Sequence, residues 1–501
     1  MTQLQPEPIG WRKAVVLSLV AVTCFHMAYT PLKSGLLAFG IVGYVACLVQ
    51  LARLRTTRQS FYVGLAVGFA CFAPQLECFW RIFGPAAIAL WLVLAFWIAL
   101  FLALAHLALV RFGMKRGVLL VPFLWTGLEY FRSELYYLKF SWLNVGYAFA
   151  GMPFVPMGTL GMYAIGFFAA GAIVTWKQFG RAWLERMRLI HFIILVMIIA
   201  LLTAVFLPAY SMRRDFLHTF VVAGVQLEFP NERDIIKSLN GVLEKHSVLL
   251  QKDARFMRRT NLDLIVLPEY TLEGEPTPAM ANWCRDNQKF LVVGGKDFPS
   301  TSGGTNAQQG FSGKDYFNTA FVISTNGEVV FKQAKSVPIQ FFKDGLPAPE
   351  QKVWESPWGK IGICICYDLS YTRVTDELVR QGAQMLIVPT MDVADWGRHQ
   401  HELHARVAPV RAAEYGIPIF RVASSGISQG VNRSGWVQSR APFSGEGEII
   451  FFGARLSPEY KGSLPLDRYL APLCVGLTGL FIAWLAVEAF VKSPRFRRHS
   501  G

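Results

Sequence analysis

The run KIGICICYD, residues 360–368, is a largely apolar, β-branched segment that ends in a cysteine followed by two polar residues. Such a run predicts a strand buried on both faces, and Cys366 stands where the apolar sequence ends. The rigid end of a strand is a position from which a nucleophile can be presented. Cys366 is therefore the candidate nucleophile. The alternative, a small buried hydrophobic residue, suits Cys364 better.

Further runs of the same kind recur on both sides of this segment, with helical stretches at 232–259 and 399–415 between them. Near-continuous hydrophobicity is typical of strands covered on both faces. We therefore expect residues 213–458 to form one α/β domain, an α-β-β-α sandwich with helices outside two sheets. The runs are FVVAGVQ (220–226), DLIVLPE (263–269), FLVVGG (290–295), TAFVIS (319–324), EVVFK (328–332), QMLIVPT (384–390) and IPIFRVAS (417–424).

Two charged residues stand at or near the ends of such runs, Glu269 in LIVLPEY (264–270) and Lys335 in VVFKQAK (329–335). A carboxylate, an ammonium and a thiol are together sufficient to form, stabilise and resolve an acyl-thioester. Desolvation at a strand end is expected to raise the pKa of Glu269, so that it accepts the thiol proton. Lys335 is expected to stabilise an oxyanion. Taken singly, each is equally well a solvated surface charge.

The whole chain of 501 residues is too apolar for a soluble protein of this size, with 53% hydrophobic residues and a mean hydropathy of +0.35. Eight apolar runs have about the 20 residues that a bilayer core requires; they fall near 12–30, 34–52, 60–80, 86–110, 117–131, 154–176, 189–210 and 469–491. Glu129 and Arg132 stand at the end of the fifth run. Their spacing of three allows them to pair on one helix face, and a contact with a lipid headgroup is the alternative.

Lys and Arg residues gather in alternate short loops and at both ends of the chain, which predicts that both termini are cytoplasmic. The sequence thus divides into a membrane domain at 1–212, an extramembrane domain at 213–458 on the opposite side, and an eighth span with a tail at 459–501. The net charge of +15 is explained largely by these loops. Because there is no aromatic-interleaved basic stripe, a nucleic-acid partner is not expected.

LPEY, GEVVFKQAK and ICYD, in that order and spacing, resemble the carbon–nitrogen hydrolase (nitrilase) superfamily with its Glu–Lys–Cys triad. WTGLEYFRSEL (125–135) and FSWLNVGYAFAGMPFVPMGTLGMYAIGFF (140–168) resemble the membrane signature of apolipoprotein N-acyltransferases, bacterial inner-membrane enzymes with eight spans and a periplasmic nitrilase domain. The resemblance implies that Cys366 is the nucleophile, Glu269 the general base and Lys335 the oxyanion partner, with Tyr367 lending its N–H.

The resemblance also implies a substrate pair and no cofactor. An acyl chain would pass from a phospholipid, typically phosphatidylethanolamine, to Cys366 and then to the N-terminal amine of a diacylglyceryl-cysteine lipoprotein. We expect a monomer. The alternatives are a membrane-tethered carbon–nitrogen hydrolase or amidase, in which water resolves the thioester, and a catalytically inert lipid-binding scaffold.

The sequence departs from the family pattern after the lysine, where SVPIQFFKD (336–344) places Lys343 at a position usually held by a supporting glutamate. A second cation there is expected to lower the pKa of Lys335. The supporting carboxylate would then be Asp344 or Glu350. Asp368 stands where the acyltransferases more often have glutamate, and FSW (140–142) replaces the more usual FPW.

Other residues have two interpretations each. Four apolar side chains near the predicted site form either the wall or lid through which an acyl chain enters, or ordinary core packing; they are Phe341, Phe342, Met391 and Trp396. His399, His401 and His404 resemble a metal cluster, but His399 and His401 would point to different faces of a helix. A metal site is therefore not expected.

Overall fold

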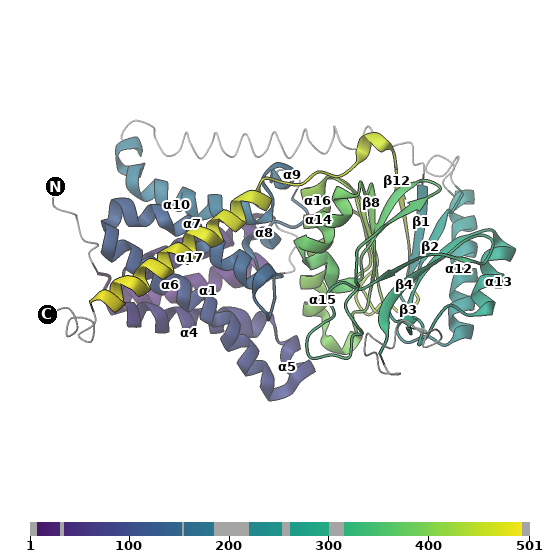
Figure 1. The fold of residues 1–501 in the computed structure, drawn as a ribbon, viewed down its shortest axis with the longest axis horizontal. Helices are drawn as coiled ribbons and strands as arrows, with labels where there is room; N and C mark the ends of the chain where they lie inside the picture. Colours follow the sequence, from purple (N-terminus) through teal and green to yellow (C-terminus); the bar gives the residue numbers. More distant parts are fainter. Residues whose placement is uncertain are drawn as a thin grey trace. The chain divides into compact units, whose positions relative to one another are not determined.

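The computed structural model describes residues 8–30, 35–152, 155–184, 220–252, 261–299 and 315–492. The chain divides into two compact units, a helical one formed by residues 1–149, 159–201 and 465–501 and an α/β one formed by residues 150–158 and 202–464. Figure 1 shows the helices and strands of each unit. The expected domain boundary at 212/213 lies outside the described residues.

The helical unit contains several apolar helices. Among the residues that the structure describes, three stretches are long and apolar enough to cross a membrane, Trp11–Tyr29, Cys78–Leu135 and Asp467–Val491, and two shorter apolar helices are Leu36–Leu51 and Met162–Val174. The elements in chain order are α1 (Trp11–Tyr29), α2 (Gly35–Ala38), α3 (Gly40–Leu51), α4 (Thr57–Gln75), α5 (Cys78–Phe83), η1 (Gly84–Ala86), α6 (Ala87–Gly117), η2 (Val118–Leu120), α7 (Val121–Tyr130), η3 (Phe131–Leu135), α8 (Val145–Ala148), α9 (Met157–Leu160), α10 (Met162–Leu184) and α17 (Asp467–Val491).

The predicted eight spans are matched only in part. The runs at 86–110 and 117–131 belong to one nearly continuous helical stretch, which turns at Gly113, where φ is +70°. Glycine adopts this left-handed conformation without the steric cost that a Cβ brings. The seventh predicted span, 189–210, lies outside the described residues.

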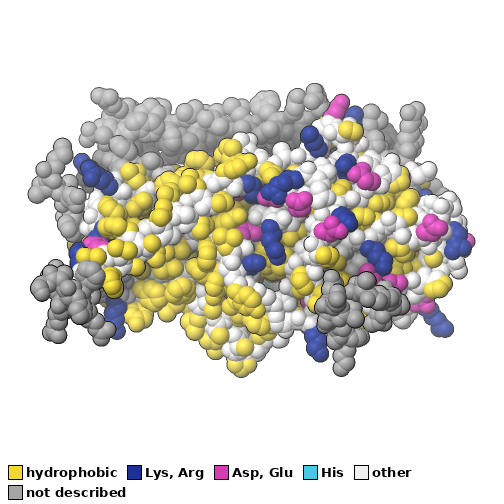
Figure 2. All heavy atoms as spheres, in the orientation of Figure 1, with side chains coloured by type: hydrophobic (Ala, Val, Ile, Leu, Met, Phe, Trp, Pro, Cys, Tyr) yellow, Lys and Arg dark blue, Asp and Glu magenta, His cyan; other side chains and the backbone are white. Residues whose placement is uncertain are grey.

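Helices α4 and α6 pack closely because small residues face each other. A Cβ added at Gly64 would lie 2.7 Å from Ala99 Cα, and one added at Gly68 would lie 2.8 Å from Ala95 Cα. Such a glycine pair four residues apart is typical of helix contacts within membranes, where close backbone approach replaces the hydrophobic effect as the driving force. Figure 2 shows hydrophobic side chains gathered over the helical unit, including α17, whereas charged side chains are scattered over the α/β unit.

The α/β unit contains two six-stranded sheets, with strand orders β12-β1-β2-β3-β4-β5 and β11-β10-β9-β8-β7-β6. The strands are β1 (Phe220–Val225), β2 (Leu264–Val266), β3 (Phe290–Asp297), β4 (Phe317–Ile323), β5 (Val329–Ala334), β6 (Val353–Ser356), β7 (Gly359–Ile363), β8 (Met385–Thr390), β9 (Ile419–Ala423), β10 (Gln429–Val431), β11 (Val437–Arg440) and β12 (Ile449–Ala454). Strands β1, β2 and β3 run parallel in one sheet, and β7, β8 and β9 in the other.

Helices cover the outer face of each sheet, which confirms the predicted α-β-β-α sandwich (Figure 1). Alternate residues of β1 face opposite ways: Phe220 and Val222 join the core between the sheets, and Val221 and Ala223 join the core beneath the helices. The outer helices are α12 (Glu232–Lys252) and α13 (Pro278–Asn287) on the first sheet, and α14 (Thr372–Arg380), α15 (Arg398–His404) and α16 (Val407–Tyr415) on the second. Short 3₁₀ turns are η5 (Cys366–Ser370), η6 (Ala394–Trp396) and η7 (Pro458–Tyr460).

Candidate active site

The structure brings Glu269, Lys335 and Cys366 into one buried cluster of the α/β unit. Glu269 follows β2 and Lys335 follows β5 in one sheet, whereas Cys366 follows β7 in the other. None of the three is more than 3% exposed. The Nζ atom of Lys335 lies 2.8 Å from Oε1 of Glu269. Each sheet therefore contributes part of the cluster, and each of the three residues lies beyond the carboxyl end of its strand: β2 and β7 in parallel pairs, β5 at the antiparallel edge.

Cys366 does not end a strand as predicted. Strand β7 ends at Ile363, and Cys366 begins the 3₁₀ turn η5 with φ of +51°. A non-glycine residue in this left-handed region is uncommon and carries backbone strain, which is frequent at functional sites. The strain is held in place by the neighbouring Asp368, whose backbone N–H bonds to the Ile365 carbonyl at 3.0 Å.

Asp368 ties this turn to the segment that follows Lys335. Its buried carboxylate accepts hydrogen bonds from the backbone N–H groups of Val337 at 2.7 Å, Ser336 at 3.0 Å and Ile365 at 3.2 Å. Burial raises the pKa of Asp368 to about 6, against the lowering effect of Lys335 and of these hydrogen bonds. Asp368 thus fixes two loops from different sheets relative to each other.

The main chain of Met391, just beyond β8, contacts both the carboxylate and the thiol. Its N–H donates to Oε2 of Glu269 at 2.7 Å, and its carbonyl accepts from Sγ of Cys366 at 3.8 Å. From its apolar side chain, Met391 had two interpretations in the sequence, the wall or lid for an acyl chain or ordinary core packing. In the structure, the contacts are made by the N–H and carbonyl of Met391, and a pattern of side-chain types does not predict such main-chain contacts.

Asp344 is the carboxylate that supports Lys335. Its Oδ2 lies 2.7 Å from Lys335 Nζ and accepts the Ile339 N–H at 2.7 Å. The Tyr270 hydroxyl donates to Oδ1 at 2.9 Å. Glu350, the alternative from the sequence, has a side chain that is 61% exposed and pairs with Lys352 instead. The rearranged loop thus uses Asp344.

The prediction that Lys343 lowers the pKa of Lys335 is wrong. Burial does lower this pKa, but the attraction of Glu269 and Asp344 outweighs burial and raises it well above the ordinary lysine value. Lys335 therefore stays charged throughout the neutral range. The loop turns Asp344, not Lys343, toward the ammonium group.

Burial raises the pKa of Glu269, and Asp344 adds to this effect while Lys335 opposes it. Burial also raises the pKa of Cys366 well above that of a free thiol, the Glu269 carboxylate raises it further, and Lys335 lowers it. The resting cysteine is therefore a thiol. A thiol that acts as a nucleophile needs a base to remove its proton, and the Glu269 carboxylate, whose charge acts on this thiol, is a candidate base.

Sequence analysis missed Asn318, a polar residue inside the apolar strand β4. Its Nδ2 donates to Oε1 of Glu269 at 2.6 Å and to Oδ1 of Asp344 at 2.9 Å. The only signal in the sequence is an amide among residues that are otherwise buried and apolar, FNTAFVI (317–323). A buried amide in such a run is expected to have polar partners.

The aromatic residues proposed for acyl-chain access lie on the two loops that hold the cluster. Phe341 is 66% exposed with φ of +69°, and Phe342 is 41% exposed. The rings of Phe342 and Trp396 lie with their centroids 6.3 Å apart. The ring of Tyr367, next to the candidate nucleophile, packs against Tyr371 with centroids 5.0 Å apart. The exposed pair Phe341 and Phe342 is not core packing.

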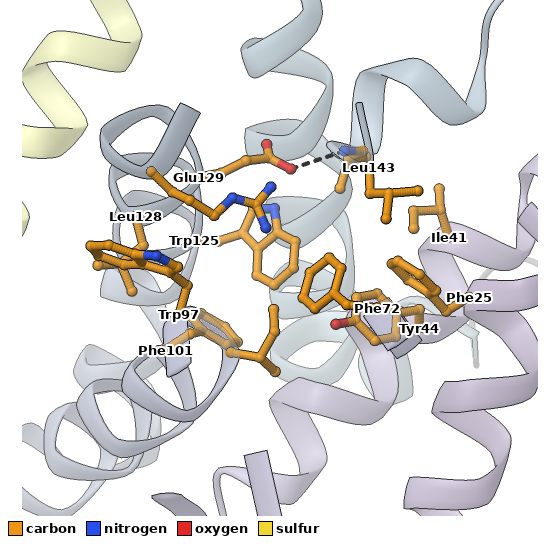
Figure 3. A pocket seen from close by; sticks show the side chains of 13 residues that line it. Phe25, Ile41, Tyr44, Phe72, Trp97, Phe101, Trp125, Leu128, Glu129 and Leu143 are labelled. Atoms are coloured by element: carbon orange, nitrogen blue, oxygen red, sulfur yellow. Dashed lines mark hydrogen bonds between the residues drawn. The ribbon is translucent and has the colours of Figure 1, made fainter. Parts of the chain in front are cut away.

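Glu129 and Arg132 lie in the helical unit, where they line a small aromatic cavity (Figure 3). Both are buried, and each bonds to the 144–145 segment: Glu129 Oε1 accepts the Val145 N–H at 2.9 Å, and Arg132 donates to Asn144 Oδ1. Arg132 belongs to a π-helical turn, and the opposite charges of Glu129 and Arg132 attract each other across it.

The cavity beside these two residues has a volume of about 30 Å³, room for roughly one water molecule. The headgroup contact that the sequence allowed for Glu129 and Arg132 stays a prediction. The aromatic residues that line the cavity include Phe25, Tyr44, Phe72, Trp97, Phe101 and Trp125.

Two of the three histidines considered as metal ligands, His401 and His404, contact Asp392. His404 Nδ1 lies 2.8 Å from Oδ1 of Asp392, and His401 Nε2 lies 3.2 Å from the Asp392 carbonyl oxygen. Among the described residues, no group of three His, Cys, Asp or Glu side chains is arranged to hold a metal ion. Asp392 was not identified from the sequence, although it follows the buried run QMLIVPT as Glu269 follows its own.

Comparison with known proteins gives matches to both units. A family described as carbon-nitrogen hydrolase matches residues 222–441, and one described as the apolipoprotein N-acyltransferase N-terminal domain matches residues 21–175. The apolipoprotein N-acyltransferase of Geobacter metallireducens is 25% identical over 519 residues, covering 93% of this chain and 92% of that protein. The apolipoprotein N-acyltransferase of Shewanella oneidensis is 24% identical over 437 residues, covering 77% of this chain and 80% of that protein. Saccharomyces cerevisiae Nit3, a nitrilase-superfamily structure, is 20% identical, with a TM-score of 0.37 over 49% of this chain and 92% of that one.

Proposed function

This chain belongs to the apolipoprotein N-acyltransferase family of the carbon–nitrogen hydrolase (nitrilase) superfamily, and we propose that it transfers an acyl chain from a phospholipid to the N-terminal amine of a diacylglyceryl-cysteine lipoprotein. The observation that carries the proposal is the presence of both family domains in one chain, together with a buried thiol, carboxylate and ammonium in the second. The chain is a membrane protein, and a lipid acyl donor is available at a membrane.

In the first half-reaction, Sγ of Cys366 attacks the ester carbonyl carbon of the phospholipid while Glu269 takes the thiol proton. The carbonyl oxygen becomes an oxyanion, which the ammonium of Lys335 and the backbone N–H of Tyr367 stabilise. When the ester C–O bond breaks, the leaving alkoxide takes the proton back from Glu269. The products are a lysophospholipid and an acyl-thioester on Cys366.

In the second half-reaction, the lipoprotein amine attacks the thioester carbonyl carbon and gives a proton to Glu269. The same oxyanion contacts serve again, because the geometry of the tetrahedral intermediate is the same. The C–S bond then breaks, and the Cys366 thiolate recovers the proton from Glu269. The amide product and the free thiol complete the cycle without a cofactor.

The proposal includes a location. The Lys and Arg distribution favours cytoplasmic termini and a catalytic domain on the periplasmic side of the bacterial inner membrane. The exposed Phe341 and Phe342 then form the entrance for an acyl chain, since large apolar side chains in solvent often mark a lipid or partner contact. A monomer contains every residue that this reaction uses.

The test is intact-mass analysis of the purified full chain incubated with phosphatidylethanolamine and a diacylglyceryl-cysteine peptide. We expect one acyl mass on the wild-type chain, none on Cys366→Ala, and an acylated peptide only with the wild type. Fatty acid release without acylated peptide would support a hydrolase instead. Identical behaviour of the two chains would refute covalent catalysis by Cys366 and leave a lipid-binding scaffold.

A further inference from the structure

The candidate base and nucleophile are both held by one peptide segment, the main chain of Met391. Its N–H fixes Oε2 of Glu269 at 2.7 Å, and its carbonyl fixes Sγ of Cys366 at 3.8 Å. A rotation of this segment would move the carboxylate and the thiol relative to each other. The orientation of Met391 is therefore part of the geometry of proton transfer, although the Met391 side chain has no chemistry to contribute.

The next residue, Asp392, is fully buried and fixed at its main chain. The hydroxyl of Ser424 accepts the Asp392 N–H at 3.1 Å and donates to the Asp392 carbonyl at 2.9 Å. The Ser425 hydroxyl donates to the same carbonyl. These contacts hold the peptide groups on both sides of the Asp392 Cα, one of which includes the Met391 carbonyl.

The carboxylate of Asp392 is fixed as firmly as its main chain. Arg421, on the adjacent strand β9, donates to Oδ2, and His404 Nδ1 lies 2.8 Å from Oδ1. Gln400 Nε2 donates to Oδ1 at 3.0 Å. Burial alone would raise the pKa of Asp392, but His404 and Arg421 hold it below the ordinary range, so the carboxylate is charged at neutral pH. The charged contact from Arg421 to Oδ2, together with the contacts of His404 and Gln400 to Oδ1, gives the segment a rigid support.

We infer that Asp392 is a positioning residue for the proposed acyl transfer: through Arg421, His404 and Ser424 it fixes the Met391 main chain, and thereby the relative placement of Glu269 and Cys366. The inference rests on the proposed function, because it concerns the rate at which Cys366 takes an acyl group. It assigns no contact between Asp392 and the substrate.

A purely electrostatic role for Asp392 makes the opposite prediction. Burial, then Glu269, then the Asp392 carboxylate raise the pKa of the Cys366 thiol, against the lowering effect of Lys335. Removing the Asp392 charge would therefore ease thiol deprotonation and speed thiol chemistry. A slower acylation in Asp392→Asn consequently reports lost geometry.

The test measures the first half-reaction of the full chain in detergent, as the rate of acyl mass appearing on Cys366 with phosphatidylethanolamine. For Asp392→Asn we expect the maximal acylation rate to fall about 100-fold, the size associated with displacements near 1 Å, with the half-saturating phospholipid concentration unchanged. Ser424→Ala leaves every buried charge paired. For this variant we expect the maximal acylation rate to fall about tenfold. If Asp392→Asn does not fold, the acylation rate of Ser424→Ala alone tests the positioning role.

The matched control is Asp376→Asn, another buried aspartate of the α/β unit, which accepts a hydrogen bond from the Tyr415 hydroxyl at 2.7 Å between α14 and α16. We expect it to lower the unfolding temperature while acylation stays at the wild-type rate. Wild-type acylation rates in Ser424→Ala and in folded Asp392→Asn would overturn the inference, as would an equal loss in Asp376→Asn. A wild-type chain that never gains acyl mass would overturn the proposed function itself, and the inference with it.

Discussion

Replacing Asp344 with asparagine tests whether this residue supports Lys335 in place of the usual glutamate. The substitution keeps the side-chain size but removes the charge that lies 2.7 Å from Lys335 Nζ. It also places an amide among donors, since Ile339 N–H, Asn318 Nδ2 and the Tyr270 hydroxyl all donate to Asp344. Lys335 retains only one carboxylate partner, Glu269 at 2.8 Å.

The expected loss follows from these contacts. A hydrogen bond to a charged group contributes about 1.5–3 kcal/mol, and its loss lowers the rate by roughly 10- to 150-fold if it falls wholly on the transition state. Some of the cost falls on folding instead, because breaking a buried pair leaves charge uncompensated. We therefore expect acylation of Cys366 to fall about 10- to 100-fold, together with a lower unfolding temperature.

The assay is the time course of acyl mass on Cys366, with Glu350→Gln as the control. The Glu350 side chain is 61% exposed and pairs with Lys352 at the surface, where such pairs contribute about 0–1 kcal/mol. Glu350→Gln should therefore acylate as fast as the wild type. Unchanged acylation in Asp344→Asn, or a large loss in Glu350→Gln, would refute the assignment of Asp344.

Four further predictions concern the acidity of Glu269, the acidity of Cys366, hydrogen bonding by Asn318 and helix packing at Gly64. Because the pKa of Glu269 is raised and the base must be deprotonated, acylation should be lost as pH falls through a value above the ordinary glutamate pKa of about 4.3, as a pH–rate profile would show. Because the pKa of Cys366 is also raised, iodoacetamide at about pH 8 should alkylate it more slowly than a free cysteine; equal rates would contradict the burial argument. Asn318→Leu removes the donor to two buried carboxylates and should slow acylation about tenfold or more, whereas wild-type kinetics would exclude a role for this amide. Gly64→Ala places a Cβ 2.7 Å from the α6 backbone and should lower thermal stability in detergent, whereas Gly476→Ala, with no atom within 4 Å, should not.

Periodicity and strand ends carry much of the α/β architecture in the sequence. Buried runs flanked by polar residues indicated where the strands lie, and Glu269, Lys335 and Cys366 follow three of them. Parallel strands present their carboxyl ends at one edge, so residues beyond β2 and β7 are expected to lie close together once the two sheets face each other. The same logic applied to β8 would have identified Asp392.

The conformation of the loops could not be predicted from hydrophobic periodicity or from strand ends. Cys366 and Phe341 adopt positive φ without being glycine, and no propensity rule predicts that. The choice between Asp344 and Glu350 depends on how the loop after Lys335 folds, not on the distance along the chain. In the helical unit, Glu129 and Arg132 attract each other, but the π-helical turn at Arg132 and the contacts of both side chains with the 144–145 segment were not predicted.

Burial and the charges around Cys366 oppose formation of the thiolate before an acyl donor binds. Buried carboxylates of Glu269, Asp344, Asp368 and Asp392 lie on the segments around the thiol, and Lys335 and Arg421 are the buried cations bonded to them within the described residues. This excess of negative charge, added to burial, keeps the thiol protonated at rest. Under the proposed mechanism, a bound acyl carbonyl would place a developing oxyanion against Lys335, and the lysine charge would offset it. The reactivity of Cys366 would thus depend on the acyl donor being bound.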